Sequence, residues 1–347
     1  MIRPDIFYKR LDVLLGAVVL ILLGYLVFLD FRAAPPAPTA ATPTSTPVGP
    51  IYLNALDGSP VTSTDEELPP VVGVMIDNHP DARPESGLAE ASVVYEVPVE
   101  GSITRYFAIF PLSATVAKVG PVRSARPYFL DWLEEYGDSS YWHSGGSPEA
   151  LSDITARHIW DANEFYYGSF YWRSADRAAP HNLYTSSNNW QAFAARYGGS
   201  HSSTTWQGWN FTTSTPTGTP VGEFSLSYAS DYHVGWKFNA ASSSYVRLIN
   251  NEPEQLDDDS EVTASNIVVQ EMSMQITDSE GRLKLGTIGT GVAKIFRDGT
   301  MVRGTWKKES ATARTRFYDA SGNELDFVPG HTWIEVVPMG TSLIITN

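Results

Sequence analysis

The 347-residue chain contains no cysteine. Disulfide bonds, thiolate metal sites and cysteine nucleophiles are therefore excluded. The lipid-bearing cysteine that tethers many envelope proteins is excluded for the same reason. Any chemistry or attachment to a membrane must come from other side chains.

Basic residues are also scarce. The chain has 24 lysines and arginines against 39 acidic residues, which gives a formal net charge of −15. Such a surface repels the phosphates of nucleic acids, so we expect no nucleic-acid partner. Hydrophobic residues make up 42% of the chain, which is enough to bury the cores of about two domains.

One long apolar run stands near the N-terminus. Val13–Leu29 holds 17 residues without a charge, and as a helix it would span roughly 25 Å. Lys9 and Arg10 precede the run, so the positive-inside rule keeps residues 1–10 in the cytoplasm and exports the rest. We predict a single transmembrane helix over 11–31 that acts as a signal anchor in the cell membrane. A cleaved signal peptide is the alternative.

The composition then divides the exported part. Residues 33–50 contain six prolines and no charge, which predicts an extended linker that we place at 32–69. From 70 to 200 we predict a mixed α/β domain, because continuous apolar runs typical of strands buried on both faces alternate with helical patterns. The predicted strands are 71–76, 92–99, 105–110 and 139–144, and the predicted helices are 125–136, one beginning at Ser147, and 187–197.

A second pattern follows the α/β domain. Residues 201–222 are rich in Ser, Thr and Gly and predict a connecting loop. Short strand-like runs separated by turn signals then predict a mostly antiparallel β domain over 223–347. Within it, the alternation in Thr332–Val337 predicts a strand with one face in solvent.

Arginine is concentrated in the α/β domain. Residues 70–200 carry eight arginines and one lysine, and the guanidinium group offers a bidentate fork for carboxylate or phosphate. The turn at Gly120-Pro121 would aim Arg123 and Arg126 at one place, beside a helix start that favours anions. Structural ion pairs with Glu96 and Glu100 are the alternative.

Polar residues recur where the predicted strands end, which is where α/β folds collect ligand sites. We therefore predict a ligand-binding site without a cofactor. Its candidate residues are Asn78, Arg83, Glu96, Glu100, Arg105, Arg123, Ser124, Arg126, His143, Ser147, His181 and Asn182.

Catalysis is not assigned. Glu96 and Glu100 are weak candidates for a carboxylate pair, because residues four apart share one face of a strand. His143 and Ser147 are weak candidates for a base and a nucleophile, although the Gly-x-Ser-x-Gly spacing is missing. The same turn could instead bind an anion or begin a helix.

Metal binding is not predicted either. No His-x-x-x-His or Glu-x-x-His spacing is present. A metal site would need distant residues to converge in the fold. The residues considered are Asp77, His79, His143 and His181.

Seven segments together resemble a known family, the YerB-like exported lipoproteins of unknown function. The segments are MIDNHPDARPESGL (75–88), VYEVPVEGSITRYFAIF (94–110), KVGPVRSARPYFLDW (118–132), HSGGSP (143–148), APHNLYTS (179–186), GTWKK (304–308) and PGHTWIEVVP (329–338). The resemblance covers roughly 70–345 and implies two regions that meet near residue 222. It implies no enzymatic activity. The chain departs from the family in lacking the lipidated cysteine and in having Ser92 where relatives carry an acid.

The leading hypothesis is an extracytoplasmic cell-envelope protein that binds an anionic or glycan-type ligand of the cell wall. Two alternatives stay open. One is an envelope hydrolase that uses Glu96 with Glu100, or His143 with Ser147. The other is a scaffold whose protein partner is a membrane-bound envelope enzyme.

Overall fold

The computed structural model describes residues 4–31, 52–198 and 206–346. The chain separates into two units, residues 1–50 and 51–347. The first unit contains the helix α1 (Pro4–Phe31). Among the residues described, none of the helices is both long and apolar enough to pass through a membrane, so the structure does not support the predicted transmembrane anchor over 11–31.

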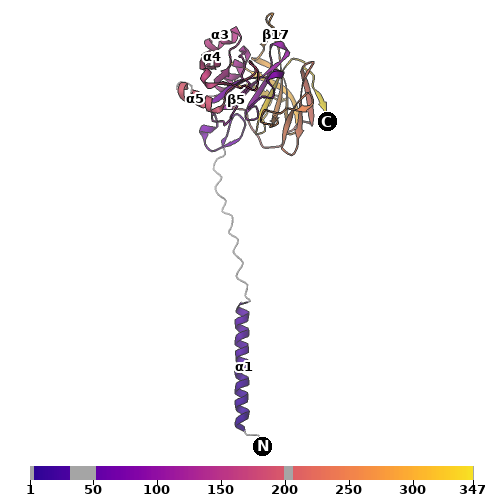
Figure 1. The fold of residues 1–347 in the computed structure, drawn as a ribbon. Coiled ribbons are helices and arrows are strands. Elements are labelled where there is room, and N and C mark those ends of the chain that lie inside the picture. Colours follow the sequence, from indigo (N-terminus) through magenta and orange to yellow (C-terminus); the bar gives the residue numbers. More distant parts are fainter. Residues whose placement is uncertain (1–3, 32–51, 199–205, 347) are drawn as a thin grey trace. The chain divides into compact units, whose positions relative to one another are not determined.

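The second unit is built on a mixed sheet of eleven strands (Figure 1). Ten of them follow the order β10 (Thr219–Pro220), β20 (Thr300–Lys308), β19 (Gly289–Arg297), β16 (Asn266–Met272), β22 (Thr332–Pro338), β4 (Val93–Pro98), β5 (Thr104–Pro111), β3 (Val71–Asp77), β6 (Ser140–His143) and β7 (Trp160–Asn163). The eleventh, β21 (Arg316–Tyr318), pairs with β20. Because β22 lies between β4 and β16, the sheet joins residues from both sides of the predicted loop at 201–222.

A second, six-stranded sheet is formed by C-terminal residues and is antiparallel throughout. It consists of β14 (Glu252–Pro253), β13 (Ser244–Ile249), β12 (Tyr232–Asn239), β11 (Glu223–Ala229) and β23 (Ile344–Thr346), with β15 (Thr263–Ala264) paired to β13. Three small pairs complete the strands: β1 (Tyr52–Leu53) with β2 (Pro60–Val61), β8 (Trp172–Arg173) with β9 (Leu183–Tyr184), and β17 (Met274–Ile276) with β18 (Leu283–Leu285). The prediction of a mixed α and β region followed by a β-rich antiparallel region is confirmed.

The described helices of this unit all belong to its N-terminal half, and in Figure 1 α3, α4 and α5 lie away from the orange and yellow C-terminal strands. They are α2 (Pro127–Leu133), α3 (Pro148–Ala156), α4 (Glu164–Tyr167) and α5 (Ser187–Tyr197). Single 3₁₀ turns stand at η1 (Thr64–Glu66), η2 (Pro80–Ala82), η3 (Glu100–Ser102), η4 (Glu134–Tyr136) and η5 (Gly168–Phe170). Residues 52–69, at the described end of the predicted linker, form β1, β2 and η1.

The large sheet has a hydrophobic core on each face. In β3, Val72 and Val74 belong to one core while Met75 belongs to the other, as the two-residue period of a strand requires. The first core is shared with the six-stranded sheet and α5. The second core is shared with α2 and α3. Both faces of the central strands are therefore covered, which explains their continuous apolar runs.

One prediction about β22 is wrong. Thr332–Val337 is buried at every position, so neither face of this strand meets solvent. The six-stranded sheet covers the face that carries Glu335, and the Glu335 carboxylate accepts hydrogen bonds from Trp236 Nε1 (2.8 Å) and from the Tyr228 hydroxyl (2.7 Å). The polar residue in the alternating pattern belongs to a hydrogen-bonded network between the two sheets and not to a solvent-exposed face.

Candidate functional site

The strands β3, β4, β6 and β7 all run in the same direction, so their carboxyl ends meet at one edge of the large sheet. Ligand sites of open α/β sheets form at such an edge. Asp77 and Asn78 lie at the end of β3, Glu100 follows β4, and His143 ends β6. Arg105, near the start of the antiparallel β5, pairs with Asp77 in the ladder.

Three residues lie around the buried carboxylate of Asp77 at this edge. Together with it they form what we call the Asp77 cluster: Asp77, His79, Arg123 and His181. Asp77 Oδ2 lies 2.7 Å from Arg123 Nε and 2.7 Å from His181 Nδ1. The ring of His79 stacks on that of His181 with 4.7 Å between centroids. Residues from three separate loops therefore converge on one acid that is itself inaccessible.

A second group lies beside it, the Glu100 cluster, made of Glu100, Arg105 and Arg126. Arg126 Nε donates to Glu100 Oε2 at 2.9 Å, and Arg105 Nη2 donates to Glu100 Oε1 at 3.3 Å. Arg105 Nη1 also donates to the carbonyl oxygen of Ser124 at 3.0 Å, so Ser124 contributes its backbone. Arg105 links the two clusters, because it faces Asp77 across the ladder.

Burial lowers the pKa of all three guanidinium groups, those of Arg105, Arg123 and Arg126. Burial disfavours a charged group that has lost its hydration without full compensation. The two clusters carry three guanidinium groups against two carboxylates, those of Asp77 and Glu100. Within these two clusters the guanidinium groups therefore outnumber the carboxylates by one, although the chain as a whole is strongly acidic.

A cleft of about 290 Å³ opens next to the Asp77 cluster, and Asn78, His79, Arg83, Thr104 and Tyr232 contribute to its lining. Arg83 Nε donates to Asn78 Oδ1 at 2.8 Å and Nη2 donates to the Asn78 carbonyl oxygen at 3.1 Å. Within the described residues, Nη1 of Arg83 makes no hydrogen bond. The guanidinium lies 4.6 Å from the centre of the Tyr232 ring, which fixes its orientation.

Glu96 lies behind this cleft and is fully buried. Its Oε1 accepts hydrogen bonds from the hydroxyl groups of Thr104 and Tyr232, both at 2.7 Å, and its Oε2 is paired with Arg247. Glu254 and Glu335 also face Arg247. We call these residues, Glu96, Tyr232, Arg247, Glu254 and Glu335, the Glu96 network. It lies between the two sheets, and all five of its residues are buried.

The predicted pairing of Glu96 with Glu100 does not form, because each carboxylate has its own partners. Glu96 binds residues of the six-stranded sheet, while Glu100 binds two arginines at the edge of the large sheet. Arg105 and Arg126 therefore pair with Glu100 alone, and Glu96 takes Arg247, which the sequence analysis did not single out.

The turn HSGGSP has a structural role in every contact described. His143 Nδ1 lies 2.7 Å from the Gly145 carbonyl oxygen and Nε2 lies 2.7 Å from Asp161 Oδ1, so both ring nitrogens face acceptors. Ser147 is the N-cap of α3, and its hydroxyl accepts a hydrogen bond from the amide of Ala150 at 3.2 Å. His143 and Ser147 do not hydrogen-bond to each other.

Asn182 is also engaged within the protein. Its Nδ2 donates to the carbonyl oxygens of Ser174 (2.9 Å) and Arg177 (3.1 Å), and its Oδ1 accepts from Arg173 (3.0 Å). It orders the segment that presents His181 to Asp77.

Sequence reasoning missed the partners of Glu96 in the second half of the chain. Arg247 stands in β13 at a position that alternates with the buried Tyr245. A charge on the inward face of a strand is the signal that could have found it, because such a group is rarely buried unless it is paired. Glu335 occupies an equivalent inward position in β22.

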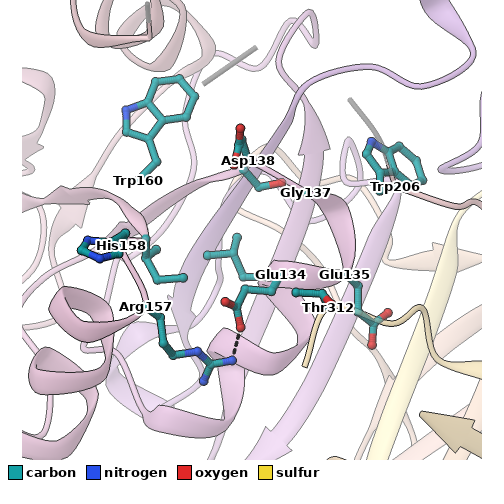
Figure 2. A pocket seen from close by; sticks show the side chains of 12 residues that line it. Glu134, Glu135, Gly137, Asp138, Arg157, His158, Trp160, Trp206 and Thr312 are labelled. Carbon is teal, nitrogen blue, oxygen red and sulfur yellow. Dashed lines mark hydrogen bonds and ion pairs between the residues drawn. The ribbon is translucent and has the colours of Figure 1, made fainter. Parts of the chain in front are cut away.

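Another cavity, of about 380 Å³, lies at the opposite edge, where β6 and β7 begin (Figure 2). Figure 2 shows Arg157 reaching toward Glu134, with which it forms an ion pair. Trp160 and Trp206 line the same cavity. None of the predicted site residues lies there.

Two family descriptions match the chain. Residues 56–200 match the N-terminal domain, and residues 224–334 the C-terminal domain, of a protein family of unknown function, DUF3048. The chain belongs to the DUF3048 family. This confirms the resemblance seen in the sequence motifs, and the two matched segments meet in the single large sheet.

Two comparisons concern one DUF3048 relative. The Bacillus subtilis (strain 168) protein named "Putative lipoprotein YerB" is 34% identical to this chain, over 77% of this chain and 81% of the relative. The crystal structure of YerB from Bacillus subtilis matches with a TM-score of 0.74 and 30% identity, over 84% of this chain and 99% of that chain.

Proposed function

We propose that this protein is an extracytoplasmic cell-envelope protein that binds an anionic ligand at the carboxyl edge of its large sheet. A glycan that carries carboxylate or phosphate groups is the class of ligand that fits. The name of the relative YerB, which describes a lipoprotein, supports an envelope location for the present chain.

One observation carries the proposal. Arg105, Arg123 and Arg126 lie beside the carboxylates of Asp77 and Glu100, and burial lowers the pKa of each guanidinium. An anion placed there would stabilise the charged form of these guanidinium groups, and charge-assisted hydrogen bonds are about twice as strong as neutral ones. Within the described residues, the two terminal nitrogens of Arg123 have no hydrogen-bond partner, so they are available to a ligand.

The test is binding of defined probes to the full chain in detergent, measured by calorimetry. Soluble peptidoglycan fragments and a phosphate-bearing wall polymer are the anionic probes, and a neutral chitooligosaccharide is the uncharged one. We expect the anionic probes to bind and the neutral probe not to bind. Arg123→Ala should weaken that binding at least tenfold, because it removes a partly exposed guanidinium while Asp77 keeps its bond to His181.

Arg303→Ala is the matched control, because Arg303 is exposed on β20 and lies in neither cluster. It should bind the anionic probes as tightly as the unchanged chain does. Equal binding of the neutral probe, or an intact Arg123→Ala variant with unchanged affinity, contradicts the proposal.

The hydrolase alternative finds no support in the geometry. A catalytic acid or base must come within hydrogen-bond reach of a substrate atom, directly or through one water. Glu96 is sealed behind Thr104 and Tyr232, and Ser147 accepts from the start of α3. The scaffold alternative stays a prediction, because no described contact bears on it.

Attachment is a separate part of the proposal. The chain has no cysteine to carry a lipid, and its longest uncharged apolar run is Val13–Leu29. We propose that this N-terminal segment holds the body at the membrane. Deletion of residues 1–31 should release the protein from the membrane fraction, and retention of the shortened chain there would contradict the proposal.

A further inference from the structure

Two histidines and an aspartate lie close together beside Asp77. His79, Asp81 and His181 each offer one such atom, and the three atoms lie within 4.8 Å of one another. His79 Nδ1 is already 3.6 Å from Asp81 Oδ2. Ligand atoms on a tetrahedral zinc ion, at about 2.0–2.1 Å from it, are about 3.3 Å apart. Small side-chain movements would therefore close the set.

The side chains of His79 and Asp81, which would have to move to bind an ion, are partly or largely exposed. The side chain of Asp81 is 76% exposed and that of His79 is 37% exposed, so both can turn without disturbing the core. His79 is the N-cap of the turn η2, and its Nδ1 accepts a hydrogen bond from the Asp81 amide at 3.2 Å, so a metal ion at Nδ1 would replace that bond. His181 is more enclosed, at 14% exposure, and it supplies the fixed point of the group.

The buried Asp77 carboxylate is placed to orient the ring of His181, as outer-sphere carboxylates orient histidine ligands in metal proteins. Histidine ligands of metal ions commonly donate their other ring N–H to a carboxylate, which fixes the tautomer and raises the basicity of the ring. His181 Nδ1 lies 2.7 Å from Asp77 Oδ2, so Nδ1–H is donated there. The lone pair of His181 Nε2 is then left to bind a metal ion.

The chemistry of the three ligands agrees with this arrangement. Asp77 is paired with Arg123, so Asp81 contributes the negative charge next to the ion. Two imidazole nitrogens and one carboxylate oxygen form a known zinc ligand set, in which the fourth position is left open for water or another ligand. His143 cannot join, because both of its ring nitrogens face acceptors at 2.7 Å.

We propose that His79, Asp81 and His181 form a binding site for a divalent transition-metal ion of the zinc type, with Asp77 as the positioning residue. This inference does not depend on the anionic ligand. The site lies at the rim of the cleft lined by His79 and Arg83.

The test uses the full chain in detergent after treatment with a chelator. Zn²⁺ binding is measured by calorimetry, and Co²⁺ serves as a probe whose visible absorption reports nitrogen ligands and coordination number. We expect one Zn²⁺ per chain and a four- or five-coordinate Co²⁺ spectrum. His79→Ala and His181→Ala should each weaken Zn²⁺ binding at least tenfold, and Asp77→Asn should do so about 10–100-fold, as loss of an outer-sphere partner does.

His233→Ala is the control, because His233 is exposed on β12 and lies outside the cluster. It should leave Zn²⁺ affinity unchanged. If His181→Ala does not fold, as judged by circular dichroism, His79→Gln and Asp81→Asn give the same test at exposed positions. Unchanged Zn²⁺ affinity in folded variants, or an octahedral Co²⁺ spectrum, overturns the inference. Anionic probes are titrated in the presence of chelator, so this outcome is separate from the outcome for the anionic ligand.

Discussion

At the scale of single residues, Glu85 is a carboxyl group whose environment disfavours its charge. It is fully buried, and neither carboxylate oxygen has a hydrogen-bond partner within the described residues. Burial, and then repulsion from Glu254, raise its pKa well above the usual value. The folded protein therefore favours neutral Glu85.

The raised pKa of Glu85 determines how the free energy of unfolding changes with pH. A raised pKa in the folded state contributes stability that is fully present below the unfolded pKa, near 4.5, and that is lost as the pH rises through the folded value. Glu85→Gln removes the proton requirement and keeps the shape. We expect the variant to be more stable than the unchanged chain by more than about 1.4 kcal/mol at pH 8, the free energy of one unit of pKa shift, because the amide needs no proton, and by much less at pH 4.

Denaturant unfolding of both proteins at the two pH values measures this difference. Glu252→Gln, at an exposed position of β14, should change the free energy of unfolding by less than about 0.5 kcal/mol at either pH. A gain for Glu85→Gln that is the same at pH 4 and pH 8 would show that the carboxyl group is not held neutral.

At the scale of elements, the start of α3 allows a test of whether Ser147 caps the helix or acts through its hydroxyl group in binding. Ser147 accepts a hydrogen bond from the Ala150 amide, and Pro148 follows it in the first helical turn. Replacement of such a cap by alanine costs about 1 kcal/mol, whereas asparagine and aspartate are equally good caps. We expect Ser147→Ala to lower the free energy of unfolding by about that amount and Ser147→Asn to restore it.

The measurement is chemical denaturation of the three chains, with binding of the anionic probes assayed alongside. Ser152→Ala is the control, because Ser152 is exposed within the same helix and caps nothing. Loss of probe binding in Ser147→Asn with stability intact would contradict the capping role and point to the hydroxyl group itself.

The same scale shows how far local patterns predict structure. The run at 71–76 predicted β3, and the helix predicted at 187–197 matches α5, because each has a clear period and clear ends. β7 (Trp160–Asn163) was missed, since four residues with an aspartate among them give no pattern. Its strand character comes from pairing with β6, which no local signal reports.

For the site, the sequence predicts which residues lie at the strand ends but not which residues pair with each other. Strand ends could be located, so residues such as Asn78, Arg105 and Arg123 were placed at one edge in advance. Which acid pairs with which base could not be known, because the partner of Glu96 lies 151 positions away in Arg247. The sequence offers His79 and His181 among its possible metal ligands, whereas nothing in the local pattern distinguishes Asp81, two residues after His79, from other acidic residues.

At the scale of the whole molecule, the two matched family regions share one sheet and one buried network. β22 pairs with β4 over Val93–Glu96, and Arg247 joins Glu96 to Glu254 between the sheets. Removing one member of a buried charge pair leaves an uncompensated charge, which costs about 3–5 kcal/mol. The N-terminal region therefore depends on the C-terminal region for both hydrogen bonds and charge.

A truncation tests this dependence. In a chain that ends at residue 222, β4 loses β22 as its neighbour, and Glu96 loses both Arg247 and Tyr232. We expect this chain to lack a cooperative thermal transition, and we expect the full chain to unfold in a single step, as followed by circular dichroism. Co-expression with residues 223–347 should restore the transition, because the missing strand and the guanidinium group are supplied in trans. A truncated chain that melts cooperatively by itself would show that the large sheet is divisible at the family boundary and that the Glu96 network does not hold the two regions together.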